Sequence, residues 1–174
     1  MKPSTSIFGQ AATALLAGAL ILGTAITAKA QSEQSPNGLE GTWRVQVTQY
    51  NCATGATLPP FWSLLSFARG GVLTETTTSP GFLPGQRTPG HGVWTSAGAN
   101  AYTAVSEAFV LFDSPTTPPG LKAGVQKILQ AIVLSDENHF TSLASVKFFN
   151  NDGTTRTGCA RAAGTRFDTS PDQP

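Results

Sequence analysis

The sequence predicts an all-β protein, an eight-stranded antiparallel up-and-down barrel preceded by a signal peptide. Apolar and polar residues alternate in eight short runs, and a period of two residues is the pattern of a strand with one buried face. Short turns join most consecutive runs, which makes neighbouring strands antiparallel and adjacent. The two cysteines of the chain, Cys52 and Cys159, fall near the end of the first run and inside the last. A disulfide between them would join the outer strands and close the sheet.

The first 30 residues have the features of a secretory signal peptide. Lys2 supplies positive charge, residues 7–27 are uncharged and mostly Ala, Leu, Gly and Ile, and Ala28-Lys29-Ala30 fits a small-x-small cleavage site before Gln31. An uncleaved membrane anchor is the alternative, because the apolar stretch approaches spanning length. Export predicts a secreted or periplasmic protein. Two cysteines usually form a disulfide in those compartments, with two free thiols as the alternative.

The mature chain has the size of one domain and almost no net charge. Loss of the leader removes two of the 11 Lys and Arg, which leaves nine against ten Asp and Glu. There is no basic patch, so we expect no nucleic-acid partner, and no later stretch is long and apolar enough for a transmembrane helix. We expect a flexible lead-in over 31–40, the barrel domain over 41–168 and a loose tail over 169–174. The sequence does not predict an oligomeric state.

The first four strands are expected at 42–51, 61–68, 72–78 and 91–96. In the first of them, Trp43, Val45 and Val47 share one face. The loop at 79–90 is long and rich in Pro and Gly, and loops of this kind often act as lids. Its apolar residues Phe82 and Leu83 are expected to lie over the mouth of the barrel.

The last four strands are expected at 101–112, 121–134, 140–149 and 154–167. Residues 121–134 also fit an amphipathic helix. We favour a strand, because a four-residue turn leads directly from this segment into the next run, as in a hairpin. Asp152-Gly153 is a strong hairpin signal before the last strand. If residues 121–134 form a strand, the side chains of four residues lie on the same face, namely Gln126, Ile128, Gln130 and Ile132.

Closure requires the first strand to pair with the last in antiparallel register. If Cys52 lies opposite Cys159, the same register puts Trp43 opposite Asp168 and Arg44 opposite Phe167. Closure removes the exposed sheet edges. It also leaves an interior that is just wide enough for side chains or for one small ligand.

The first strand carries a short motif of a known family. Gly41-Thr42-Trp43 resembles the G-x-W signature of lipocalins and of the wider calycin group. The chain also resembles small secreted bacterial proteins with a lipocalin-like barrel over most of 41–167. The resemblance implies that an arginine of the last strand packs over the tryptophan at the closed end of the barrel. Arg166 is the residue expected there, so Gly41, Trp43 and Arg166 are the expected closure residues.

The interior is predicted to bind a small apolar molecule. Small residues on facing strands, such as Ala104 and Ala144, could leave a cavity of several hundred cubic ångströms among large aromatic side chains. Apolar walls with a few polar points are typical of ligand sites. The expected ligand-binding residues are Trp62, Trp94, Tyr102, Phe109 and His91.

Catalytic and metal chemistry find little support in the sequence. His91 and His139 are isolated, so we expect no metal site and no cofactor, and we assign no catalytic residue. We expect Glu75 and Glu107 to face solvent. If either of them, or Arg69 or His91, pointed inward, a cyclase or isomerase using the same cavity would be the alternative, and we leave open whether the protein is an enzyme. A scaffolding module with a packed interior is the other alternative.

Overall fold

The computed structural model describes residues 38–111 and 122–168, and within these ranges the chain folds into eight β-strands. They are β1 (Gly41–Tyr50), β2 (Phe61–Ala68), β3 (Val72–Thr77), β4 (Gly90–Ser96), β5 (Ala101–Leu111), β6 (Lys122–Leu134), β7 (His139–Asn150) and β8 (Thr155–Arg166). Each strand begins and ends within one residue of its expected bounds, and the segment with the helical alternative is strand β6. The expected signal peptide, most of the lead-in, the loop at 113–120 and the tail lie outside the described residues.

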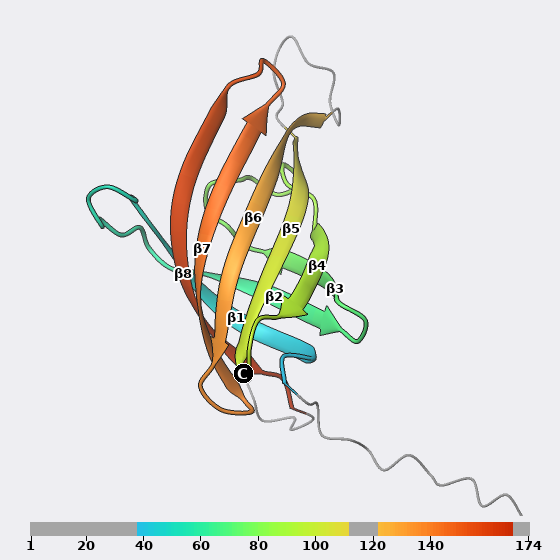
Figure 1. Ribbon diagram of the computed structural model, residues 1–174. Helices are drawn as coiled ribbons and strands as arrows, with labels where there is room; N and C mark the ends of the chain where they lie inside the picture. The colour runs from blue at the N-terminus through green and yellow to red at the C-terminus, as the bar shows by residue number, and fades with distance from the viewer. Residues whose placement is uncertain (1–37, 112–121, 169–174) are drawn as a thin grey trace, which may run out of the picture. The chain divides into compact units, whose positions relative to one another are not determined.

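The eight strands close into one barrel in sequence order (Figure 1). Every strand pairs antiparallel with the next one along the chain, and β8 pairs antiparallel with β1. The all-β, up-and-down prediction is therefore confirmed. Among residues 38–111 and 122–168, no helix has the length and hydropathy needed to cross a membrane.

The register of the closing pair differs from the prediction by two residues. Trp43 lies opposite Arg166, and Tyr50 lies opposite Cys159. The prediction failed because it treated Cys52 as part of the strand, whereas β1 ends at Tyr50 and Asn51 begins a turn, accepting hydrogen bonds from the next backbone amides with its side chain. The disulfide is nevertheless formed, with the two Cα atoms 5.4 Å apart. A shift of two residues leaves the same face of each strand inside.

One end of the barrel is filled by an aromatic core. The largest fully buried side chains are those of Trp43, Phe67 and Phe140. The ring centroids of Trp43 and Phe140 are 4.9 Å apart, and Phe67 packs edge-on against Phe140 at 6.5 Å. Leu39 precedes β1 and is fully buried in the same cluster, so the last residues of the expected lead-in belong to the core. We call this end the floor of the barrel.

Arg166 covers the floor in the manner that the family resemblance implies. Its guanidinium carbon lies 4.1 Å from the ring centroid of Trp43. It donates hydrogen bonds to the carbonyl oxygens of Gly38 (2.7 Å), Glu137 (2.7 Å) and Glu40. Gly41 has φ +121°, and a Cβ atom there would lie 2.7 Å from Nη1 of Arg166, so both conformation and space favour glycine. Burial lowers the pKa of Arg166, but the group stays charged near neutral pH.

Candidate functional site

A cavity of about 50 Å³ lies inside the barrel above the floor. Its walls come from the inward faces of β1, β2, β3, β6, β7 and β8. The wall combines polar and charged residues with branched or very small apolar side chains, and the latter are Val45, Val47, Leu65, Ile128, Ala144, Val146, Ala160 and Ala162. Ala144 and Ala160 lie directly opposite each other on β7 and β8. Two methyl groups fill far less space there than the aromatic rings of the floor do, which leaves the barrel hollow at this level.

The cavity adjoins a larger hollow at the open end of the barrel, which we call the mouth. The mouth has a volume of about 570 Å³. Gln49, Ser79 and Val146 line both the cavity and the mouth. The enclosed cavity is much smaller than the several hundred cubic ångströms expected from the sequence. The cavity alone is below the ~300–1,000 Å³ of ordinary ligand pockets, whereas the mouth alone lies within that range.

The segment between β3 and β4, residues 78–89, forms one side of the mouth, and we call it the strap. The backbone of its last part pairs with the end of β5, where the amide of Leu111 donates to Gln86 (2.6 Å) and that of Thr88 donates to Phe109 (3.0 Å). This pairing extends the sheet beyond β4 and directs Arg87 into the barrel. Farther along the strap, the ring of Phe82 packs against that of Phe148 at the mouth, with centroids 6.2 Å apart, as expected for a lid residue. Leu83, in contrast, is 69% exposed.

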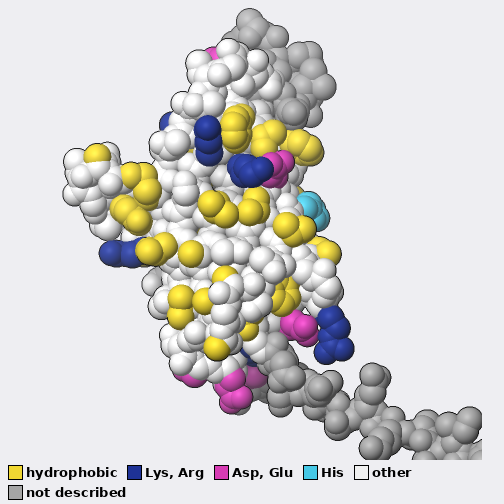
Figure 2. All heavy atoms as spheres, viewed as in Figure 1, with side chains coloured by type: hydrophobic (Ala, Val, Ile, Leu, Met, Phe, Trp, Pro, Cys, Tyr) yellow, Lys and Arg dark blue, Asp and Glu magenta, His cyan; other side chains and the backbone are white. Residues whose placement is uncertain are grey.

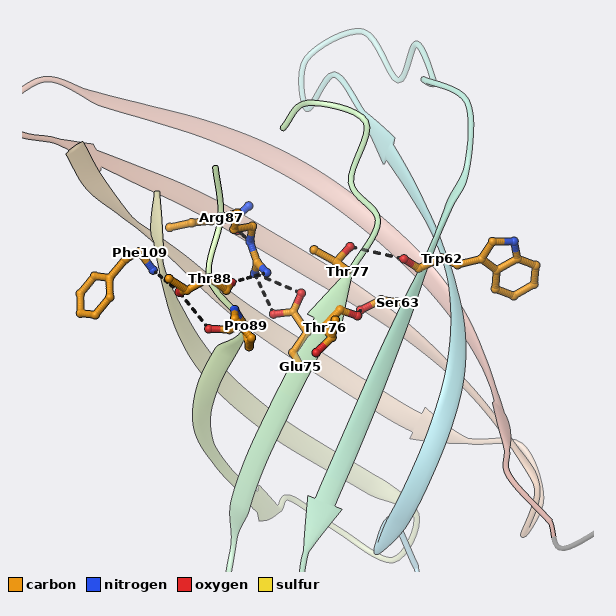
Figure 3. Close-up of polar contacts among 10 residues, drawn as sticks. Trp62, Ser63, Glu75, Thr76, Thr77, Arg87, Thr88, Pro89 and Phe109 are labelled. Atoms are coloured by element: carbon orange, nitrogen blue, oxygen red, sulfur yellow. Dashed lines mark hydrogen bonds and ion pairs between the residues drawn. The ribbon is translucent and has the colours of Figure 1, made fainter. Parts of the chain in front are cut away.

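Arg87 forms a buried ion pair with Glu75 in the cavity wall (Figure 3). Nη2 of Arg87 lies 2.9 Å from one carboxylate oxygen and 3.1 Å from the other, and the two side chains are only 5% and 6% exposed. Nε of Arg87 donates to the side-chain oxygen of Gln126, and Nη1 donates to the carbonyl of Thr88. Gly90 makes room for the carboxylate, since a Cβ atom there would lie 2.6 Å from Oε2 of Glu75.

The expectation that Glu75 faces solvent was wrong. The alternation of β3 that buries Leu73 also turns Glu75 inward. The compensating charge comes from Arg87 in the strap. The strap has no periodic pattern, so the neutralisation of a buried Glu75 could not be predicted from the sequence. Glu107 does face solvent, where it pairs with Lys127 at 3.0 Å.

The structure places the five expected ligand-binding residues away from the cavity. The rings of Trp62 and Phe109 are 50% and 52% exposed and point away from the barrel interior (Figure 3), and His91 is also exposed on the outer face. Trp94 and Tyr102 point inward but pack against each other at 5.8 Å beside the floor. The choice rested on aromatic character, whereas the position within the two-residue period decides which side chains enter the barrel.

Sequence reasoning did not select the polar side chains that do line the cavity. Gln126, Gln130 and Ser142 are among them, and Gln126 and Ser142 are only 4% and 6% exposed. A signal existed, because the period of 121–134 puts both glutamines on the same side as Ile128 and Ile132. Among the described residues, no three His, Cys, Asp or Glu side chains gather closely enough to hold a metal ion.

Comparisons with known proteins give no family. No family model and no curated protein matches the chain. One similar solved structure is a protein of unknown function from the DUF3598 family of Nostoc punctiforme, with 12% sequence identity and a TM-score of 0.36. The match covers 74% of this chain and 47% of that one, so the chain spans about half the length of its neighbour. A likeness this weak carries no argument about function.

Proposed function

We propose that the protein binds a slender apolar molecule, which enters through the mouth and extends into the cavity above the floor. The supporting observation is a cavity that combines apolar and polar side chains, open at one end and filled by Trp43, Phe67 and Phe140 at the other. In small-molecule sites, apolar side chains supply contact surface and polar groups fix the orientation of the ligand. The narrow cavity favours a chain-like molecule over a fused ring system.

The mouth supports the proposal with aromatic surface. Tyr50, Phe82 and Phe148 line it, and the guanidinium of Arg156 lies 4.5 Å from the ring centroid of Phe148. The cavity and the mouth thus form a path with apolar surface along its length. The sequence predicted a lipocalin-like barrel that binds a small apolar molecule in its interior, and this prediction remains part of the proposal.

A bulky side chain in the cavity tests the proposal. Ala160 is 4% exposed and lines the cavity, so Ala160→Phe is expected to fill it and to weaken binding of the chain-like fluorescent probe methyl parinarate at least about tenfold. Overpacking of this kind usually costs about 1–3 kcal/mol of stability, so the thermal melt is recorded in parallel. The matched control is Ala163→Phe, which adds the same ring on the exposed outer face of β8. Unchanged binding by a folded Ala160→Phe protein contradicts the proposal.

Secretion or periplasmic location also belongs to this proposal. The disulfide between Cys52 and Cys159 supports it, because such bonds persist mainly in oxidising compartments. Purification from the native host would test both parts together, because the exported chain should begin at Gln31 and native mass spectrometry should detect a molecule that remains bound.

The outer wall supports a second candidate function, association with a second copy of the chain. Leu129, Val133 and Leu143 are 52%, 46% and 63% exposed on neighbouring strands, and Figure 2 shows hydrophobic side chains spread over this view of the barrel. Exposed apolar patches often mark interaction sites. Light scattering should then detect dimers that Leu143→Glu dissociates, and a monomer at all concentrations excludes this candidate.

The enzyme alternative has less support. Glu75 does point inward, which the alternative required, but both of its carboxylate oxygens accept hydrogen bonds from Arg87. A carboxylate held in this way is poorly placed to transfer protons, because a general acid or base must reach the substrate.

A further inference from the structure

We infer that Gln126 donates a hydrogen bond from its amide nitrogen to the bound molecule, and that this molecule is a neutral, chain-like compound with a carbonyl oxygen. This inference rests on the proposed function, since it concerns the ligand of the same cavity.

The orientation of the Gln126 side chain follows from its neighbour. An arginine side chain can only donate hydrogen bonds, so Nε of Arg87 must meet the oxygen of the Gln126 amide. The amide nitrogen is then the end that remains for another partner. Arg87 is itself fixed by two contacts to Glu75 and one to the carbonyl of Thr88. The ion pair therefore acts as a positioning group for the glutamine.

The nitrogen of this amide lacks a partner within the part of the chain that the structure describes. Gln126 is 4% exposed and lines the cavity, and its side chain accepts one hydrogen bond, from Arg87. Among the described residues, the fully buried side-chain atom without a hydrogen-bond partner is Oγ of Ser106, so the amide nitrogen of Gln126 is accessible from the cavity. Polar groups inside a native protein are nearly always hydrogen-bonded. Since the cavity lies against this side chain, an acceptor atom inside the cavity would complete the hydrogen bonding.

The charges beside Gln126 favour a neutral acceptor over a carboxylate, although the exposed Arg161 on β8 also lines the cavity. Glu75 neutralises Arg87, and both are almost fully buried. An anionic group placed beside them would face the carboxylate of Glu75 in a region of low dielectric and would have to lose its hydration. A ketone or ester oxygen accepts a hydrogen bond from an amide without that cost. The apolar wall formed by Val47, Ile128 and Ala160 then surrounds the rest of the chain.

The test compares three probes of similar length: methyl nonyl ketone, undecane and undecanoate. The ratio of ketone affinity to undecane affinity is expected to be about three- to tenfold higher in the wild type than in Gln126→Met, which is the effect of one neutral hydrogen bond. Comparing the ratio between proteins cancels the difference in hydration of the two probes. Undecanoate is expected to bind the wild type more weakly than the ketone. Gln130→Met, on the same strand and in the same cavity, should retain the wild-type ratio.

The outcomes separate this inference from the proposed function. An unchanged ratio of ketone affinity to undecane affinity in Gln126→Met, or a lower ratio in Gln130→Met instead of Gln126→Met, overturns the inference alone. Tighter binding of undecanoate overturns the neutral ligand class. Failure of every probe to bind overturns the proposed function as well.

A measurement on the wild type alone tests the inference even if the Gln126→Met protein does not fold. The infrared carbonyl stretch of the bound ketone should move to lower frequency than in undecane solution, because a hydrogen bond weakens the carbonyl bond. A stretch at the frequency of the undecane solution contradicts the inference, and an ordered water on Gln126 would give that result.

Discussion

Arg166 holds together three separate parts of the chain at the floor. Its guanidinium reaches the carbonyl oxygens of Gly38 and Glu40 before β1 and that of Glu137 in the turn before β7, while its face covers Trp43. Trp43 in turn donates from Nε1 to the carbonyl of Leu39 at 3.0 Å. A planar group with five donors can serve several carbonyls and an indole at once, which an ammonium group cannot do.

Replacement of Arg166 by methionine is expected to lower the free energy of unfolding by about 2–4 kcal/mol, because it removes hydrogen bonds to three part-buried carbonyl groups and the contact with Trp43. Arg166→Lys should restore only a part of this, since one ammonium cannot reproduce the fork of donors. Urea unfolding monitored by tryptophan fluorescence measures the change. Arg161→Met, on an exposed position of the same strand, is the control and should change stability by less than about 0.5 kcal/mol. Equal losses in the two methionine variants would contradict this role of Arg166.

At the scale of strands and loops, the sequence predicted the periodic parts of the molecule and missed the irregular ones. The bounds of the eight strands follow from alternation and turn residues, and even β6 was identified because its hairpin context outweighed a helical pattern. The closing register was wrong because Cys52 lies in a turn, where pairing rules do not apply. The strap could not be placed, because a loop carries no period from which the direction of Arg87 could be read.

The candidate site shows the same division. Alternation alone places Gln126 and Gln130 together on one face, so the polar side of the cavity was within reach of the sequence. The choice of Trp62 and Phe109 instead followed residue type, although each is flanked in β2 or β5 by residues that point inward. The ion pair of Glu75 and Arg87 required a contact between a strand and the strap, which no local pattern encodes.

At the scale of the whole molecule, the two ends of the barrel are stabilised by different means. The floor is held by the packing of Trp43, Phe67 and Phe140 and by Arg166. At the mouth, the disulfide links the turn after β1 to β8 across 107 positions of sequence. The cavity lies between these two regions. Access to it is through the mouth, which is held by the disulfide and not by a packed aromatic core.

Removal of the disulfide is expected to destabilise the protein without changing its fold. The chain-entropy model gives about 4.7 kcal/mol for a loop of this length as an upper value, and native strain would reduce it. Cys52→Ser combined with Cys159→Ser should lower the midpoint of urea unfolding, and reductant should lower that of the wild type by the same amount. The double variant provides the control, because reductant should leave its midpoint unchanged. Equal midpoints for wild type and double variant would show that the bond contributes no stability.

The position of the disulfide also has a consequence for the order of events during biogenesis. The core cluster of the floor contains neither cysteine, so we expect a newly made chain with reduced thiols to pack its floor while the mouth around Cys159 still lacks the disulfide. A ligand bound before the disulfide forms is expected to dissociate faster than one bound afterwards. Stable binding is therefore expected only in an oxidising compartment, and the ligand would be a compound present in that compartment and not one that binds where the chain is synthesised.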